Sequence, residues 1–241
     1  MQQPIALIAA MKEELDALLV RFPEHEVRPH FNTQLYHARC GSQELVITQS
    51  GVGKVNAACT LTLLLSDFNP VCVINTGCAG GLQSDQHILD LVVPEQVAYT
   101  GVDVTPLGFA YGQILGSEQR FNADSKLLAH LRCVLNTHPV PIPCHHGLLG
   151  SSDSFIYQQE QLERINRHFG DAVHCVDMEG GAIAHTCTRF RVPFLILRVI
   201  SDLPRKGENA PDFKTFLTQA SALSADLCES LVRRLSTQDS L

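Results

Sequence analysis

Short runs of apolar residues alternate along this chain with segments in which apolar residues recur every three or four positions. Runs bounded by small or polar residues predict buried strands, and amphipathic segments predict helices that cover a sheet. The predicted strands are residues 5–9, 44–49, 71–75, 90–94, 95–99, 146–149, 175–178 and 194–200. The predicted helices are residues 13–21, 55–65, 126–136, 180–190 and 213–235.

The alternation of strand and helix predicts an α/β sheet with helices on both of its faces. In such folds the ligand binds beyond the carboxyl ends of the strands. Small or acidic residues gather at five of the corresponding places, which are residues 11–14, 77–81, 152–153, 178–179 and 201–202. We therefore expect one ligand site, built from five separate segments, at that edge of the sheet.

Composition narrows the class of partner and the compartment. The net charge of −7 argues against nucleic acid or an anionic membrane as the main partner, because neither attracts an acidic surface. The nine cysteines include no CxxC pair, which favours reduced thiols in the cytoplasm. The N-terminus lacks a basic region, and no stretch of about 18 apolar residues occurs, so we expect neither a signal peptide nor a membrane span.

Several familiar motifs are incomplete in this sequence. The segment Gly51-Val52-Gly53-Lys54 lacks the GxxxxGK[ST] spacing of a phosphate loop, so its glycines are expected to let backbone approach a neighbour. The segment 77–81 fits either a tight turn or a binding floor. The histidines and cysteines at 144–146 and 174–175 have no second pair at zinc-ligand spacing, so no metal is expected. Ser152 is not surrounded by a nucleophile elbow.

Three acidic residues carry more information. Asp202 ends an apolar strand, where a carboxylate must be paired, hydrogen-bonded or protonated. An ion pair with Arg198 or a helix N-cap would satisfy it without any catalytic role. Glu179 could similarly be a charge at a helix N-terminus. Glu14, taken alone, fits a solvated helix face.

Seven motifs in order resemble the bacterial 5′-methylthioadenosine/S-adenosylhomocysteine nucleosidases. The similarity runs from about residue 4 to residue 235, and the motifs occupy residues 10–14, 50–55, 75–81, 103–105, 150–156, 176–179 and 198–202. The resemblance implies a single α/β domain over residues 1–241, with a central mixed β-sheet of the nucleoside phosphorylase type. It also implies a homodimer, a small nucleoside as substrate and no cofactor.

The resemblance also implies an activity and assigns roles to residues. The activity is hydrolysis of the N-glycosidic bond of methylthioadenosine and S-adenosylhomocysteine, and also of 5′-deoxyadenosine, in methionine salvage. Glu14 corresponds to the base that activates water, and Asp202 to the acid that protonates adenine N7. The implied substrate contacts are Met11, Cys78, Ala79, Gly80, Val104, Phe155, Ile156, Met178, Glu179 and Phe213. Leu107 and Phe109 would line the alkylthio pocket of the partner subunit.

These residue types suit the chemistry. Cleavage gives the ribose oxocarbenium character, so an acid, a base and a nearby negative group are all useful. A carboxyl buried at the end of an apolar strand suits the acid that must stay protonated, and Glu179 would hold the ribose hydroxyls and the developing charge. At residue 78, however, the common pattern has a serine whose hydroxyl supports the catalytic aspartate, and a thiol is a weaker partner.

Three alternatives remain open at this stage. A phosphorylase would carry arginines for phosphate where this chain has residues 11–14 and Asn75. A sister nucleosidase acting on 6-amino-6-deoxyfutalosine would share the catalytic residues and differ only around the 5′ substituent. A non-catalytic nucleoside sensor is disfavoured by the presence of Glu14, Glu179 and Asp202 and favoured only by Cys78.

Overall fold

The computed structural model describes residues 3–138, 142–207 and 210–237. Its strands are β1 Ile5–Ala9, β2 His25–His30, β3 Thr33–Cys40, β4 Gln43–Gln49, β5 Cys72–Gly81, β6 Leu91–Tyr99, β7 Arg120–Asn122, β8 Cys144–Ser151, β9 Val173–Asp177 and β10 Phe194–Asp202. Its α-helices are α1 Lys12–Arg21, α2 Lys54–Phe68, α3 Ser125–Thr137, α4 Gln159–Phe169, α5 Gly180–Phe190 and α6 Ala210–Ser236. Three short 3₁₀ turns cover Thr105–Leu107, Gly170–Ala172 and Pro204–Lys206.

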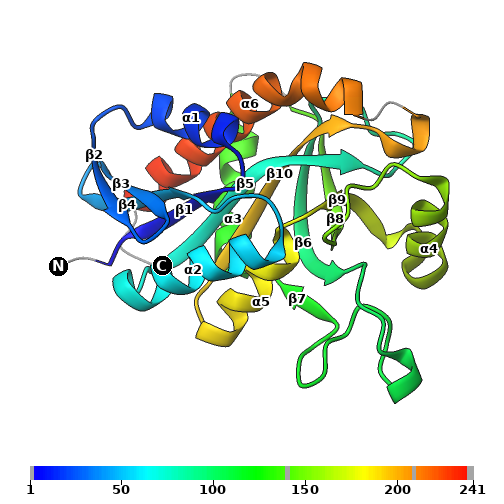
Figure 1. The fold of residues 1–241 in the computed structure, drawn as a ribbon. Coiled ribbons are helices and arrows are strands. Elements are labelled where there is room, and N and C mark those ends of the chain that lie inside the picture. The colour runs from blue at the N-terminus through cyan, green and yellow to red at the C-terminus, as the bar shows by residue number, and fades with distance from the viewer. Residues whose placement is uncertain (1–2, 139–141, 208–209, 238–241) are drawn as a thin grey trace.

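The strands form one mixed sheet, as the family resemblance implied. Its order is β10-β6-β8-β9-β5-β1-β4-β3-β2, with β7 beside β6. Strand β10 also pairs with β5, so β5, β9, β8, β6 and β10 close into a ring. Helices α1 and α6 pack together over one side of the sheet, and α2 and α5 over the other (Figure 1).

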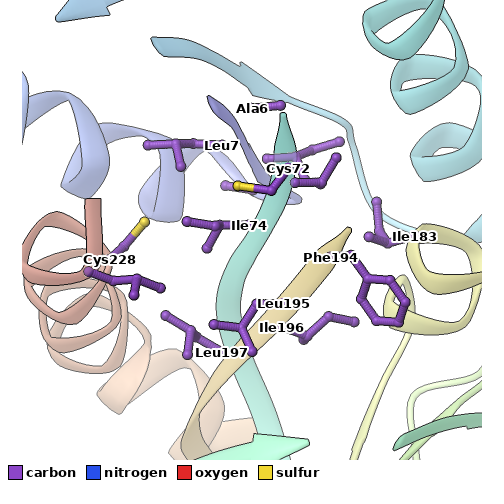
Figure 2. Packing of buried hydrophobic residues seen from close by; sticks show 14 of the residues in the cluster. Ala6, Leu7, Cys72, Ile74, Ile183, Phe194, Leu195, Ile196, Leu197 and Cys228 are labelled. Carbon is purple, nitrogen blue, oxygen red and sulfur yellow. The ribbon is translucent and has the colours of Figure 1, made fainter. Parts of the chain in front are cut away.

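Strand β10 shows why the central strands read as unbroken apolar runs. Every residue from Phe194 to Asp202 is buried, because helices cover both faces. In Figure 2, Phe194 and Ile196 lie on the side of Ile183 from α5, and Cys228 from α6 lies on the opposite side. The alternation of strand side chains thus divides one hydrophobic run between two helical layers.

Five of the nine cysteines are buried in this core: Cys40, Cys72, Cys175, Cys187 and Cys228. Burial raises the pKa of Cys72 to about 12, and it also raises the pKa values of Cys175, Cys187 and Cys228. A buried thiol of this kind stays protonated and behaves as a small apolar side chain. Cys59 is the exposed one among the free thiols.

Some boundaries differ from those that the sequence predicted. Strand β5 continues to Gly81, so residues 77–81 are strand rather than the turn considered above. Residues 90–94 and 95–99 belong to the single strand β6, whose pairing with β8 shifts register between Pro94 and Gln96. The polar strands β2 and β3 and the helix α4 were not predicted at all. Within the described residues, no helix has the length and apolar character needed to cross a membrane.

Candidate active site

A cavity of about 220 Å³ lies where β5, β9 and β10 end and α1 begins. Its wall contains most of the residues singled out from the sequence: Met11, Glu14, Cys78, Ala79, Gly80, Phe155, Ile156, Met178, Glu179, Asp202 and Phe213. Six further lining residues had been given no individual role from the sequence, although Ser201 belongs to one of the five expected segments: Ala10, Val52, Ser154, Val176, Asp177 and Ser201. Four of the five segments expected at one sheet edge therefore border one space. The fifth, residues 152–153, does not line it, although the adjoining Ser154 and Phe155 do.

Glu14 is a buried carboxylate held by backbone rather than a residue of a solvated helix face. Its Oε2 accepts N–H bonds from Ala10 at 2.9 Å and Met11 at 3.0 Å, and its Oε1 accepts one from Cys78 at 2.9 Å. Burial raises the pKa of Glu14, while these N–H donors and Arg198 oppose that rise. The Glu14 side chain folds back over the first turn of α1, where backbone N–H groups have no partner within the helix and need an acceptor.

The position of the Glu14 carboxylate depends on Gly77, which has no side chain. A Cβ on Gly77 would lie 2.5 Å from Glu14 Oε1, well inside van der Waals contact. Strand β5 can pass beneath the carboxylate only because this position is glycine. The glycine therefore serves close approach within a strand, which is a different reason from the turn considered from the sequence.

Glu179 stands at the start of α5, but its side chain is held by a different helix. Its Oε1 accepts the N–H of Gly53 at 2.7 Å, at the N-terminus of α2. Gly53 has φ +96°, a conformation that side chains other than glycine's rarely permit. Burial, followed by the neighbouring Asp177, raises the pKa of Glu179 to about 7. The glycine-rich segment thus holds a protein carboxylate.

A buried cation, Arg198, pairs with a carboxylate other than the one considered as an alternative from the sequence. Arg198 is 2% exposed, and its Nη2 is 2.7 Å from Asp177 Oδ2, rather than forming the pair with Asp202 considered above. Nη2 also donates to Asn75 Oδ1 at 2.5 Å. Asp177 Oδ2 in turn accepts the N–H of Gly180 at the start of α5. The sequence did contain a signal for this buried ion pair, because an arginine inside an apolar strand needs a buried partner of opposite charge.

Asp202 closes the opposite part of the cavity wall. It is 2% exposed, and its Oδ1 is 3.0 Å from the hydroxyl of Ser201. Its Oδ2 lies 3.2 Å from the place where a Cβ on Gly80 would sit. The bare backbone of Gly80 therefore leaves room for this carboxyl at the cavity surface.

Two aromatic rings complete the cavity. Phe155 follows β8 and Phe213 belongs to α6, and their centroids are 5.8 Å apart with planes at 71°. Together with Ile156 and Met178 they give the cavity apolar lining beside its carboxylates. Such a site fits a ligand with a flat apolar part and a polar part.

Comparisons with known proteins show which proteins this chain is similar to. The family model described as the phosphorylase superfamily matches residues 4–233. A 5′-methylthioadenosine/S-adenosylhomocysteine nucleosidase from Exiguobacterium is 38% identical over 231 residues, covering 96% of this chain and 98% of that protein. The corresponding protein of Staphylococcus haemolyticus is 37% identical over 96% of this chain and all of its own.

A solved structure shares the fold over nearly the whole chain. The Neisseria meningitidis nucleosidase in complex with methylthio-immucillin-A has a TM-score of 0.91 and 32% identity, covering 96% of this chain and 99% of that one. The chain belongs to the 5′-methylthioadenosine/S-adenosylhomocysteine nucleosidase family.

The predicted partner-pocket segment of this nucleosidase-family chain stands apart from the cavity. Val104 precedes the 3₁₀ turn Thr105–Leu107, and neither Val104, Leu107 nor Phe109 lines the cavity. The Leu107 side chain is 64% exposed. The structure of one chain therefore does not bring these three residues together with the others.

The residue that departs from the nucleosidase pattern faces a helix. The Cys78 thiol lies 3.8 Å from Ser221 Oγ and 4.0 Å from the carbonyl of Leu217, both on α6. Burial raises the pKa of this thiol beyond the range in which it would ionise. Cys78 contributes to the site through its backbone, because its N–H binds Glu14.

No group of three or more metal-ligating side chains stands close enough to hold a metal ion within the described part of the chain. The carboxylates of the cavity are bound instead by backbone N–H groups, a hydroxyl and a guanidinium. The site thus presents hydrogen-bonding and proton-transfer groups to a ligand.

Proposed function

We propose that this chain hydrolyses the N-glycosidic bond of 5′-methylthioadenosine and S-adenosylhomocysteine, and also of 5′-deoxyadenosine, releasing adenine. One observation carries the proposal. Four carboxylates, Glu14, Asp177, Glu179 and Asp202, border one apolar cavity, and none of its described lining residues is lysine or arginine. Such a cavity suits a neutral nucleoside and a developing positive charge, whereas phosphate would meet like charge.

Asp202 is the proton donor in this proposal. A purine anion is a poor leaving group, so protonation at N7 helps the glycosidic bond to break. The proton leaves Asp202 for N7 while the bonding electrons move to the adenine. Phe155 stacks on the departing base, and the backbone at Ile156 meets its edge.

Glu14 and Glu179 act on the ribose side. Glu179 accepts hydrogen bonds from the 2′ and 3′ hydroxyls and stabilises positive charge on the sugar. Glu14 takes a proton from the attacking water, whose oxygen forms the new bond to the anomeric carbon. The orientation of Glu14 is set by three backbone N–H groups, which supports a role that requires fixed geometry.

The assembly and setting of the enzyme follow the family. We propose a cytoplasmic homodimer that acts in methionine salvage and removes S-adenosylhomocysteine. Leu107 and Phe109 of one subunit would complete the 5′ pocket of the other. The exposure of Leu107 in a single chain supports this arrangement, since a large apolar side chain gains by being covered.

Adenine release by the purified protein tests the activity. Methylthioadenosine would be incubated with and without phosphate, and the products separated by chromatography. We expect free adenine and free methylthioribose at rates indifferent to phosphate. A sugar 1-phosphate formed only with phosphate would replace the proposal with a phosphorylase. Adenine released from 6-amino-6-deoxyfutalosine but not from methylthioadenosine would move the specificity to the sister nucleosidases.

A further inference from the structure

A break in strand register occurs beside the proposed proton donor. Strand β10 pairs in parallel with β5, with Ile200 opposite Ala79 and Asp202 opposite Gly80. Two steps along β10 thus match one step along β5, and Ser201 is the extra residue of a β-bulge. Bulges of this kind are rare between parallel strands and commonly re-aim side chains next to active sites.

The bulge has a direct consequence for two neighbouring side chains. In a regular strand, successive side chains point to opposite faces, which separates the polar groups of adjacent residues. Here Ser201 and Asp202 both line the cavity, and Ser201 Oγ is 3.0 Å from Asp202 Oδ1. The same hydroxyl lies 3.4 Å from the carbonyl oxygen of Ala79. All of these groups are buried, so water does not compete easily for them.

A serine hydroxyl has one proton to donate and two lone pairs that accept. It cannot donate to Asp202 and to the Ala79 carbonyl at the same time. The contacts at 3.0 Å and 3.4 Å therefore describe two alternative hydrogen-bonding arrangements of one hydroxyl group, which can rotate about its C–O bond. Donation to Oδ1 suits an ionised carboxylate. Donation to the Ala79 carbonyl suits a neutral carboxyl that carries its proton on Oδ2, because its Oδ1 is then a weaker acceptor than in the carboxylate.

We propose that Ser201 is the positioning residue for Asp202, with a hydroxyl that turns as the carboxyl gives up its proton. The inference rests on the proposed role of Asp202 as the acid. Before transfer, the hydroxyl donates to the Ala79 carbonyl. After the proton has passed to adenine N7, the hydroxyl donates to the new carboxylate, and a charge-assisted bond replaces a neutral one. The serine itself gains and loses no proton.

This assignment also explains how the chain tolerates a thiol at residue 78. The Cys78 thiol is directed to the Ser221 hydroxyl and the Leu217 carbonyl of α6. Supporting the carboxyl from residue 201, through the bulge, needs no hydroxyl at residue 78. The bulged residue thus supplies a hydroxyl hydrogen bond to Asp202 Oδ1.

The experiment compares turnover of methylthioadenosine in two backgrounds. Replacing Ser201 by alanine removes a hydrogen bond to a charged group, so we expect kcat to fall by about 10- to 100-fold with little change in KM. In the Asp202→Asn background, the same replacement should cost less than about threefold, because groups that act as a unit are not additive. An equal loss in both backgrounds would show that Ser201 acts elsewhere and would overturn the inference.

Ser151→Ala is the matched control. Ser151 is also fully buried, and its hydroxyl makes no hydrogen bond with the described residues. We expect it to leave kcat unchanged. Should Ser201→Ala fail to fold, the equally shaped pair Ser201→Thr and Ser201→Val replaces it. The threonine variant should be faster by about tenfold or more, since it alone keeps a hydroxyl. Equal turnover of the two variants would contradict the inference.

The experiment distinguishes a failure of the role proposed for Ser201 from a failure of the proposed function. A wild-type protein that releases no adenine would remove the role of Asp202 itself. A wild-type protein that releases adenine, with Ser201→Ala equally active, would leave the function intact and refute only the role of Ser201.

Discussion

The inner wall of the cavity and its outer approach are built differently. Glu14, Glu179 and Asp202 are each less than a tenth exposed, and each is held by a hydrogen bond from another residue. Leu107 belongs to a short 3₁₀ turn, with most of its side chain exposed. The comparison teaches that the carboxylates proposed for bond cleavage are held within one chain, whereas Leu107, proposed for the 5′ pocket, is exposed and does not line the cavity.

Among these predictions, the largest effect on kcat is expected when Asp202, in the inner wall, is replaced by asparagine. The amide keeps the shape but cannot donate a proton, so kcat should fall by about 10²- to 10⁴-fold. The check is steady-state adenine release together with the melting temperature of each variant. Asp171→Asn, at the exposed Gly170–Ala172 turn, is the matched control. Wild-type turnover in Asp202→Asn would assign the proton to another group.

The free energy of unfolding should depend on pH through Glu179, a carboxyl of the inner wall. The pKa of Glu179 is raised to about 7 in the folded chain, above its usual value of about 4.3 when exposed. The folded state therefore binds more protons than the unfolded state between these values. Stability contributed by this proton falls as pH rises from about 4.5 to 7, by on the order of 2 kcal/mol.

Urea unfolding of the wild type and of Glu179→Gln at pH 5 and pH 7 measures this effect. The glutamine cannot ionise, so the wild type should lose more stability than the variant between the two pH values. An identical loss in both proteins would show that the Glu179 carboxyl titrates normally in the folded state.

The smallest effect is expected at the outer approach. Leu107→Ala removes apolar contact with a 5′ substituent, so kcat/KM for methylthioadenosine should fall by about tenfold or less. The value for 5′-deoxyadenosine should change less, because that substrate lacks the sulfur-linked methyl group. Phe31→Ala is the control, since Phe31 is also highly exposed and does not line the cavity.

The interpretation of the Leu107→Ala result depends on the oligomeric state of the protein. Sedimentation of the wild type should give a dimer of the 26.5 kDa chain. A monomer that discriminates between the two substrates as described would refute the partner-pocket role of Leu107. Equal losses on both substrates in a dimer would place Leu107 outside the 5′ pocket.

Hydrophobic patterning predicted the central strands because they are buried on both faces. Strand β10 lies entirely in the core, and a strand covered on both faces is apolar at nearly every position. Strands β2 and β3 form an edge hairpin, whose exposed side chains need not be apolar, and the β2 sequence HEVRPH carries no such signal. Helix α4 did carry a signal, since its buried Leu162, Ile165 and Phe169 recur at helical spacing.

The site was predicted in part for a similar reason. Carboxylates at strand ends, such as Asp202, stand out against apolar neighbours. The burial of Glu14 could not be read from its own segment, because it depends on the N–H of Cys78 and on the missing side chain of Gly77. The bulge at Ser201 arises from the pairing of two strands and has no local sequence pattern.

The sealed cysteines make the molecule its own reporter of opening motions. A thiol reagent can attack a thiolate only after the surrounding core has separated and water has entered. Cys59, which is exposed, would react at once. Cys72 lies on β5 beside Ile5 of β1 and is labelled among the buried side chains in Figure 2, so it would react only when the sheet itself comes apart. The order in which these sulfurs become labelled would therefore map which layers separate first, with no foreign probe introduced.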